Sequence, residues 1–112
     1  MGDRTSIQFK NKDKLSPILY GQWAGKWILS AADHFLKRLE KDFPVLENGT
    51  TPISRREPSA LLPMFISIYI EPPKPGELYS WRLLDSQNVM RGNDNGHWII
   101  DVEKMTIYKG ND

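Results

Sequence analysis

The chain has no cysteine and only two histidines, which leaves few side chains for a metal site or a nucleophile–base pair. His34 falls in a helical pattern and His97 at the start of a strand pattern, and neither has a second ligand at the spacing of a zinc motif. Ser30 precedes His34 by one helical turn, but the sequence shows no third group to orient such a pair. We therefore predict no metal, no cofactor and no catalytic residues.

The segment Gly21-Gln22-Trp23-Ala24-Gly25-Lys26 could contact an anion, because it leads into a predicted helix and carries a lysine. It lacks the Gly-Lys-Ser/Thr ending of a phosphate-binding loop, since Trp27 follows Lys26. A purely structural turn is therefore the alternative to an anion site. The residues expected to bind a ligand or partner are Arg4, Tyr20, Gln22, Trp23 and Lys26, with Arg55 and Arg56 as a second patch.

Aromatic residues are frequent in the strand and helix patterns: Tyr20, Trp23, Trp27, Tyr69, Tyr79, Trp81 and Trp98. Rows of strand aromatics can stack single-stranded bases, and exposed tryptophans often dominate protein interfaces. A small α+β core is also commonly filled with such side chains. We expect about two-thirds of these residues in the core and one or two at the surface.

A catalytic alternative rests on carboxylates that the sheet would have to bring together, among them Asp3, Asp94 and Asp101. Paired carboxyl groups need a set separation, which the sequence does not supply. The alternative to a binding protein is therefore a small hydrolase or nucleotide-processing enzyme that uses Asp3, Arg4, Asp94 or His97 near the first hairpin.

The elements that would position these residues begin with a hairpin over residues 4–23. Residues 5–10 alternate between apolar and polar side chains, as in a half-buried strand, and a second strand follows at about 17–23. A helix is predicted from about residue 25 to 42 and ends before Pro44. Its apolar face consists of Ile28, Ala31, Ala32, Phe35, Leu36 and Leu39.

The second half of the chain is predicted to contribute only strands. Residues 44–63 hold four prolines and form a loop, with one short helical turn at 58–62. The apolar run Met64–Ile70 is interpreted as the central strand. Further predicted strands cover 79–84, 97–102 and 105–109, the last two as a hairpin. The order β-β-α-β-β-β-β predicts a single α+β domain over residues 1–112, with an antiparallel sheet of about five to six strands and one main helix on one face.

The charge distribution and the hydrophobic composition limit the classes of partner that this chain is expected to bind. Net charge is +1, with ten Lys+Arg against six Asp+Glu in residues 1–56 and five against eight in residues 57–112. A polarity of +4 against −3 could steer a partner, but it is far from the strongly basic character of a nucleic-acid-binding domain. No apolar stretch approaches a membrane span, and the chain lacks a signal-peptide pattern and cysteine. We expect a cytoplasmic protein that is not embedded in a membrane.

Met1–Ile7 and the segment Leu19–Gly25 resemble a family of small uncharacterised proteins from phages, prophages and bacteria. Members open Met-Gly-Asp-Arg-Ala-Asn-Ile, continue with a strand ending Leu-Tyr-Thr-His-Trp-Gly-Gly, and close with a Val-Asp-x-x-x-x-Thr-Val hairpin like Ile100–Ile107. The resemblance covers roughly the first 40 and the last 15 residues. It implies that Asp3, Arg4, Tyr20 and Trp23 lie together at one end of the first hairpin. Gln22 replaces the family's histidine and cannot titrate, which argues against catalysis.

We therefore expect a small non-enzymatic binding protein of phage or mobile-element type, which binds a protein partner or a small anionic ligand. Counter-defence inhibitors, including anti-CRISPR proteins, have this size, and the comparison with them is an analogy. A third possibility is a homodimer, because unpaired strands at the edges of a sheet can pair with those of a second copy.

Overall fold

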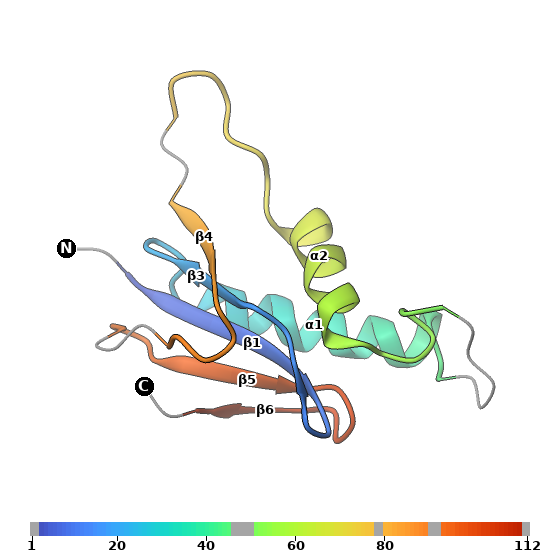
Figure 1. The fold of residues 1–112 in the computed structure, drawn as a ribbon. Helices are drawn as coiled ribbons and strands as arrows, with labels where there is room; N and C mark the ends of the chain where they lie inside the picture. Colours follow the sequence, from blue (N-terminus) through green and yellow to red (C-terminus); the bar gives the residue numbers. More distant parts are fainter. Residues whose placement is uncertain (1–2, 46–50, 78–79, 90–92, 111–112) are drawn as a thin grey trace.

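One six-stranded sheet and two helices make up the fold of the computed structural model, which describes residues 3–45, 51–77, 80–89 and 93–110 (Figure 1). The elements are β1 Thr5–Asn11, β2 Lys14–Leu15, β3 Ile18–Gly21, α1 Trp27–Asp42, α2 Pro58–Tyr69, β4 Trp81–Leu84, β5 His97–Asp101 and β6 Thr106–Lys109. The predicted α+β class, the first and last hairpins and the long helix are confirmed. None of the described helices is long and apolar enough to cross a lipid bilayer.

The strand order is β4-β3-β1-β5-β6, with β2 folding back on the end of β1. All neighbouring pairs are antiparallel except β1 and β5, which run parallel with Ser6 beside His97 and Lys10 beside Asp101 (Figure 1). This parallel pair arises because the chain leaves β4 at one edge of the sheet and enters β5 on the far side of β1. The described parts of the connection, residues 85–89 and 93–96, lie on the sheet face that the helices leave uncovered, where Ser86 and Asn93 bond Gln8 and Ser6.

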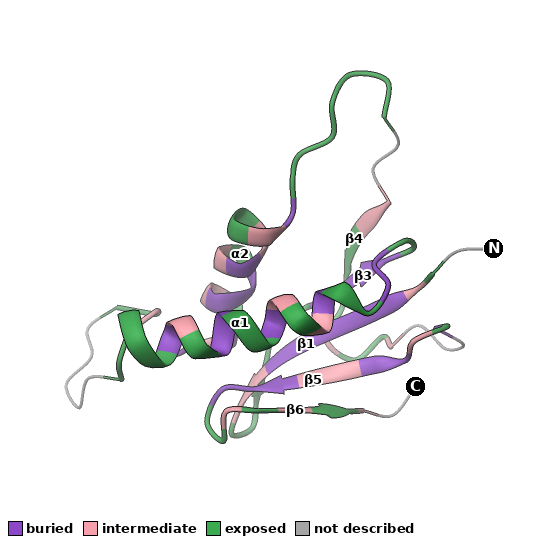
Figure 2. Ribbon diagram, turned by 180° about the vertical axis from the view of Figure 1, so that it is seen from behind, coloured by how far each residue is buried: buried purple, intermediate pink, exposed green. Residues whose placement is uncertain are grey.

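Strand β1 is buried on both faces, whereas the sequence pattern predicted burial of one face only (Figure 2). Ile7 and Phe9 face the helices and are fully buried. Ser6 and Gln8 point the other way, where the connection between β4 and β5 covers them; the Gln8 side chain, for example, donates to the carbonyl of Ser86 at 3.0 Å. The polar residues that alternate along β1 are therefore interior residues.

The prediction that the apolar run Met64–Ile70 forms the central strand is wrong, because its residues up to Tyr69 lie in helix α2. Pro58 begins this helix at its first turn, where a missing N–H costs nothing. Leu61, Leu62 and Phe65 then recur on one side of the helix and are buried against the sheet. A short continuous apolar run has no period of its own, so the sequence pattern did not distinguish a buried strand from a buried helix.

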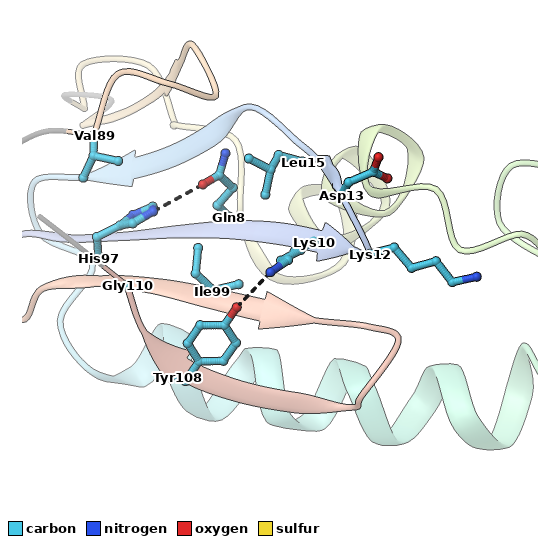
Figure 3. A pocket seen from close by; sticks show the side chains of 10 residues that line it. All are labelled: Gln8, Lys10, Lys12, Asp13, Leu15, Val89, His97, Ile99, Tyr108 and Gly110. Carbon is cyan, nitrogen blue, oxygen red and sulfur yellow. Dashed lines mark hydrogen bonds between the residues drawn. The ribbon is translucent and has the colours of Figure 1, made fainter.

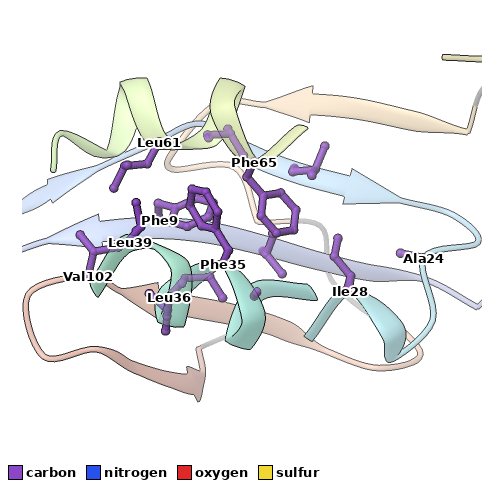
Figure 4. Packing of buried hydrophobic residues seen from close by; sticks show 14 residues of the cluster. Phe9, Ala24, Ile28, Phe35, Leu36, Leu39, Leu61, Phe65 and Val102 are labelled. Atoms are coloured by element: carbon purple, nitrogen blue, oxygen red, sulfur yellow. The ribbon is translucent and has the colours of Figure 1, made fainter. Parts of the chain in front are cut away.

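The core lies between the sheet and both helices, which cover the same face (Figure 4). Phe9 from β1, Phe35 from α1 and Phe65 from α2 meet edge to face, with ring centroids 5.5–5.7 Å apart. Such pairs contribute about 0.5–1.5 kcal/mol each beyond the burial of their area. This aromatic triad fixes both helices on the sheet and so fixes the end of α1 that meets β3.

Candidate functional site

Three chain segments meet at the end of the sheet where β1 and β5 begin and β3 ends. The N–H of Asp3 donates to the carbonyl of Gln22 at 2.8 Å, and the N–H of Gly25 donates to the carbonyl of Asp3 at 2.9 Å. From the other side, the N–H of Asn95 donates to the carbonyl of Arg4 at 2.9 Å. The N-terminal segment is thus held between the β3–α1 turn and the residues before β5, which makes this end of the molecule a preformed surface.

Gly25 allows the turn to close over the N-terminal segment. Its φ of +62° is unfavourable for other residues, and a Cβ there would lie 2.8 Å from the Asp3 carboxylate. That carboxylate also accepts a hydrogen bond from the Asn95 amide at 2.5 Å. A negative charge therefore lies beside the turn that was expected to bind an anion, and the N–H of Gly25 is already bonded to the Asp3 carbonyl. This arrangement disfavours an anion at the turn.

Arg4, an expected binding residue, pairs with Asp94 across the corner. Asp94 accepts from the Arg4 backbone N–H at 3.0 Å, from Nε at 3.3 Å and from Nη2 at 3.4 Å. The hydrogen bonds from Arg4 lower the pKa of Asp94, and those to Asp94 raise the pKa of Arg4, with a smaller contribution from Tyr20. Both side chains are about 40% exposed, so the pair is screened by solvent and acts mainly to orient Arg4.

Tyr20 lies close to Arg4 and is only 5% exposed. It points to the sheet face opposite the helices, next to Ser6 in the strand register, and the Arg82 guanidinium lies 5.5 Å from its ring centroid. The ring therefore packs against the Arg82 guanidinium, and little of the side chain is left to contact a partner.

The exposed part of the corner is formed by tryptophans. Trp23 is 59% exposed and Trp27 47% exposed, and Trp81 of β4 is half-buried with its ring edge to face with Trp27 at 6.0 Å. Trp81 packs on Gly21, where a Cβ would lie 2.6 Å from the indole ring. We call Trp23, Trp27 and Trp81, with the exposed Gln22 and Lys26, the tryptophan corner. Of the six described aromatic residues in that prediction, Trp23 and Trp27 are exposed and only Tyr20 is buried, so the expected two-thirds in the core is too high; the other three, Tyr69, Trp81 and Trp98, are half-buried against the core, and Tyr79 lies outside the described residues.

Lys26 occupies the N-cap position of α1, and among the described residues no side chain makes a capping hydrogen bond there. Its own side chain is exposed, as is that of Gln22. The structure thus brings Gln22, Trp23 and Lys26 together on the surface, as the sequence predicts. It adds Trp81, which lies 58 positions after Trp23 in the sequence and gave no signal that it would join this group.

A separate apolar groove borders the edge strand β4. It has a volume of about 280 Å³ and lies between α2 and β4. Its lining residues are Pro17, Ser59, Leu62, Pro63, Ile66, Ser67 and Leu83. Leu83 is 55% exposed and lies on the same face of β4 as Trp81. The groove was not predicted from the sequence, because five of its seven lining residues lie in helix α2, whose segment was predicted to be a loop and a strand.

The second predicted patch, Arg55 and Arg56, is split by the fold. Arg55 is exposed and forms a surface ion pair with Glu57 at 3.3 Å. Arg56 is only 6% exposed, and its Nη2 donates to the carbonyls of Leu39 and Phe43 at 3.1 and 3.2 Å. Burial lowers the pKa of Arg56 from its ordinary value. Arg56 therefore closes the C-terminal end of α1 and is not available to a partner.

The residues of the catalytic alternative are engaged in other contacts. His97 is 1% exposed, and its Nδ1 lies 2.7 Å from the Ser6 hydroxyl, which is itself fully buried. Asp94 is paired with Arg4, and one oxygen of Asp101 accepts two backbone N–H groups of the following turn at 3.0 Å. Within the described residues, no three His, Asp or Glu side chains are grouped to hold a metal ion.

Comparisons with protein-family models, curated proteins and solved structures gave no significant match to this chain.

Proposed function

We propose that this chain is a small non-enzymatic binding protein that contacts a protein partner through the tryptophan corner and the adjoining edge strand β4. The observation that carries the proposal is the exposure of Trp23 and Trp27, 59% and 47%, on a corner that backbone hydrogen bonds hold in place. Exposed tryptophans on a rigid support are the side chains that most often dominate the binding energy of protein interfaces.

The neighbouring features favour a protein over a small anion as the occupant of this site. The Asp3 carboxylate lies beside Gly25 and repels an anion at the turn. Among the described residues strand β4 lies at an edge of the sheet, so its outer side can pair with an added strand. Leu83 and the groove between α2 and β4 offer apolar surface for the side chains of such a strand. Lys26 and the excess positive charge of residues 1–56 suit an acidic partner.

The setting of this binding activity follows from the resemblance in Met1–Ile7 and Leu19–Gly25. It favours a cytoplasmic protein of phage or mobile-element type, and the small size suits an inhibitor that occupies a surface of a host protein, as counter-defence proteins do. A second copy of this chain could pair with the same β4 edge, so the experiment must also test for a homodimer.

The test compares two double variants in affinity purification from host-cell lysate with quantitative mass spectrometry. Trp23→Ala with Lys26→Ala removes the exposed centre of the corner. Lys41→Ala with Val45→Ala is the matched control, because it removes an exposed lysine and a 62% exposed apolar side chain at the other end of α1. Loss of a central hot spot costs at least about 2 kcal/mol, a roughly thirtyfold loss of affinity.

We expect the wild type and the control to enrich the same protein and the corner variant to lose it, while circular dichroism shows both variants folded. Undiminished enrichment by the corner variant would refute the site. Light scattering on the purified wild type separates a homodimer from a complex with another protein.

A further inference from the structure

A second concave surface lies on the sheet face opposite the helices, away from the tryptophan corner (Figure 3). It has a volume of about 650 Å³, which is within the range of small-molecule sites. Strands β1, β5 and β6 form its floor, the β1–β2 hairpin forms one wall, and Val89 of the connection between β4 and β5 forms another. No residue of the proposed protein-binding site lines it.

The centre of the floor is apolar. Ile99 of β5 is half-buried and lies between Gln8 and Tyr108 in the register of the sheet. Leu15, which is 37% exposed, and Val89 face the same space from the walls. An apolar floor with open aliphatic sides suits a planar or ring-shaped body, whose faces can be covered without leaving polar groups unsatisfied.

One end of the floor, formed by Gln8 and His97, is polar and fixed. The Gln8 amide donates to the carbonyls of Ser16 and Ser86 at 2.8 and 3.0 Å, which directs its Oε1 at His97 Nε2, 3.3 Å away. This geometry assigns the imidazole proton to Nε2 and leaves Nδ1 to accept from the Ser6 hydroxyl at 2.7 Å. These groups bond one another and shape that end of the floor, so recognition of a ligand depends on the residues at the mouth.

The mouth presents two donors side by side. The Lys10 ammonium lies 3.5 Å from the Tyr108 hydroxyl, a long contact that leaves room for an acceptor to bond both groups. Lys12 lines the mouth as well, whereas Asp13 at the rim adds one negative charge. Asp101 of β5 pairs with Lys10 in the sheet register, and one oxygen of its carboxylate accepts two backbone N–H groups of the next turn. Among the ion pairs of the described residues, none involves Lys10 or Lys12.

We propose that this surface binds a small organic anion with a planar apolar body and a single anionic group. The body lies on Ile99 between Leu15 and Val89, and a carboxylate or phosphate accepts hydrogen bonds from Lys10 Nζ and the Tyr108 hydroxyl. Lys12 adds favourable charge at the open side, and Asp13 disfavours a second anionic group at the rim. The charge-assisted bond to Lys10 is expected to be the strongest of these contacts.

Titrations followed by amide NMR spectra of the whole chain test the proposal. The probes are 2-naphthoate as an aromatic carboxylate, adenosine 5′-monophosphate as a phosphate on a planar base, uncharged 2-naphthalenemethanol, and inorganic phosphate. At least one of the two organic anions should shift the amides of Lys10, Ile99 and Tyr108, and the last two probes should bind much more weakly. Which anion binds more tightly distinguishes a carboxylate ligand from a phosphate ligand.

Variants connect the binding to the mouth. Lys10→Met should raise the Kd roughly tenfold and Tyr108→Phe somewhat less, whereas Lys41→Met on α1 should leave the Kd unchanged. The corner variant Trp23→Ala with Lys26→Ala should bind the probe normally, so the result is independent of the protein-binding proposal. Three results would overturn the inference: no shifts at about 10 mM of either organic anion, an unchanged Kd in Lys10→Met, or shifts confined to the tryptophan corner.

Discussion

Replacing Arg56 with alanine should destabilise the protein far more than replacing its neighbour Arg55. Arg56 donates to the carbonyls of Leu39 and Phe43 at the end of α1, and its Nη1 lies 3.2 Å from the sulfur of Met105. A hydrogen bond from a charged donor contributes about 1.5–3 kcal/mol, and the cost of burying the guanidinium offsets part of the two bonds. We expect a net loss of about 2–4 kcal/mol in the free energy of unfolding for Arg56→Ala, which lowers Tm by roughly 10 °C in a domain of this size.

Arg55→Ala is the matched control, because that side chain makes only an exposed pair with Glu57 and should cost less than about 1 kcal/mol. A second comparison uses the backbone. Arg56 has a φ of +55°, a conformation that costs a residue with a Cβ about 1–2 kcal/mol. Arg56→Gly should therefore be more stable than Arg56→Ala by about 1 kcal/mol, although glycine usually destabilises.

Urea unfolding followed by tryptophan fluorescence and far-ultraviolet circular dichroism measures all three variants. Equal stabilities for Arg55→Ala and Arg56→Ala would refute the capping role of Arg56. A lower stability for Arg56→Gly than for Arg56→Ala would instead refute the left-handed backbone at this position.

Two further predictions concern the corner. Gly21→Ala places a Cβ 2.6 Å from the Trp81 ring, so we expect a loss of about 1–3 kcal/mol and a red shift of the tryptophan fluorescence as the ring is displaced; an unchanged spectrum and stability would contradict the packing of Trp81 on Gly21. Because Arg4 holds the pKa of Asp94 below its ordinary value of 3.8, the stabilisation by this pair is present above that pH and is lost as the pH falls through the lower, folded-state pKa. Urea unfolding at a series of pH values should show wild type more stable than Asp94→Asn near pH 6, with the gap closing below about pH 4; a gap that stays constant down to pH 2 would exclude this linkage.

Periodicity alone determined the elements whose two sides differ in polarity. Helix α1 was predictable because its apolar residues recur every three or four positions while the opposite side is charged, and the two hairpins were predictable from alternation and turn residues. Helix α2 was not predictable, because Met64–Ile70 is apolar at nearly every position and such a run fits a buried strand and a buried helix equally well.

The candidate sites show the same division. The proximity of Gln22, Trp23 and Lys26 follows from their adjacency in the chain, so the sequence was enough to group them. Three other features depend on contacts between segments that are distant in the sequence: the position of Trp81 at the corner, the burial of Tyr20 and the burial of Arg56. The most important of these contacts are the pairing of β3 with β4 and the close approach of residue 56 to the end of α1. Exposure is a property of the whole packed surface, and only the tertiary structure decides which aromatic and basic side chains remain free to meet a partner.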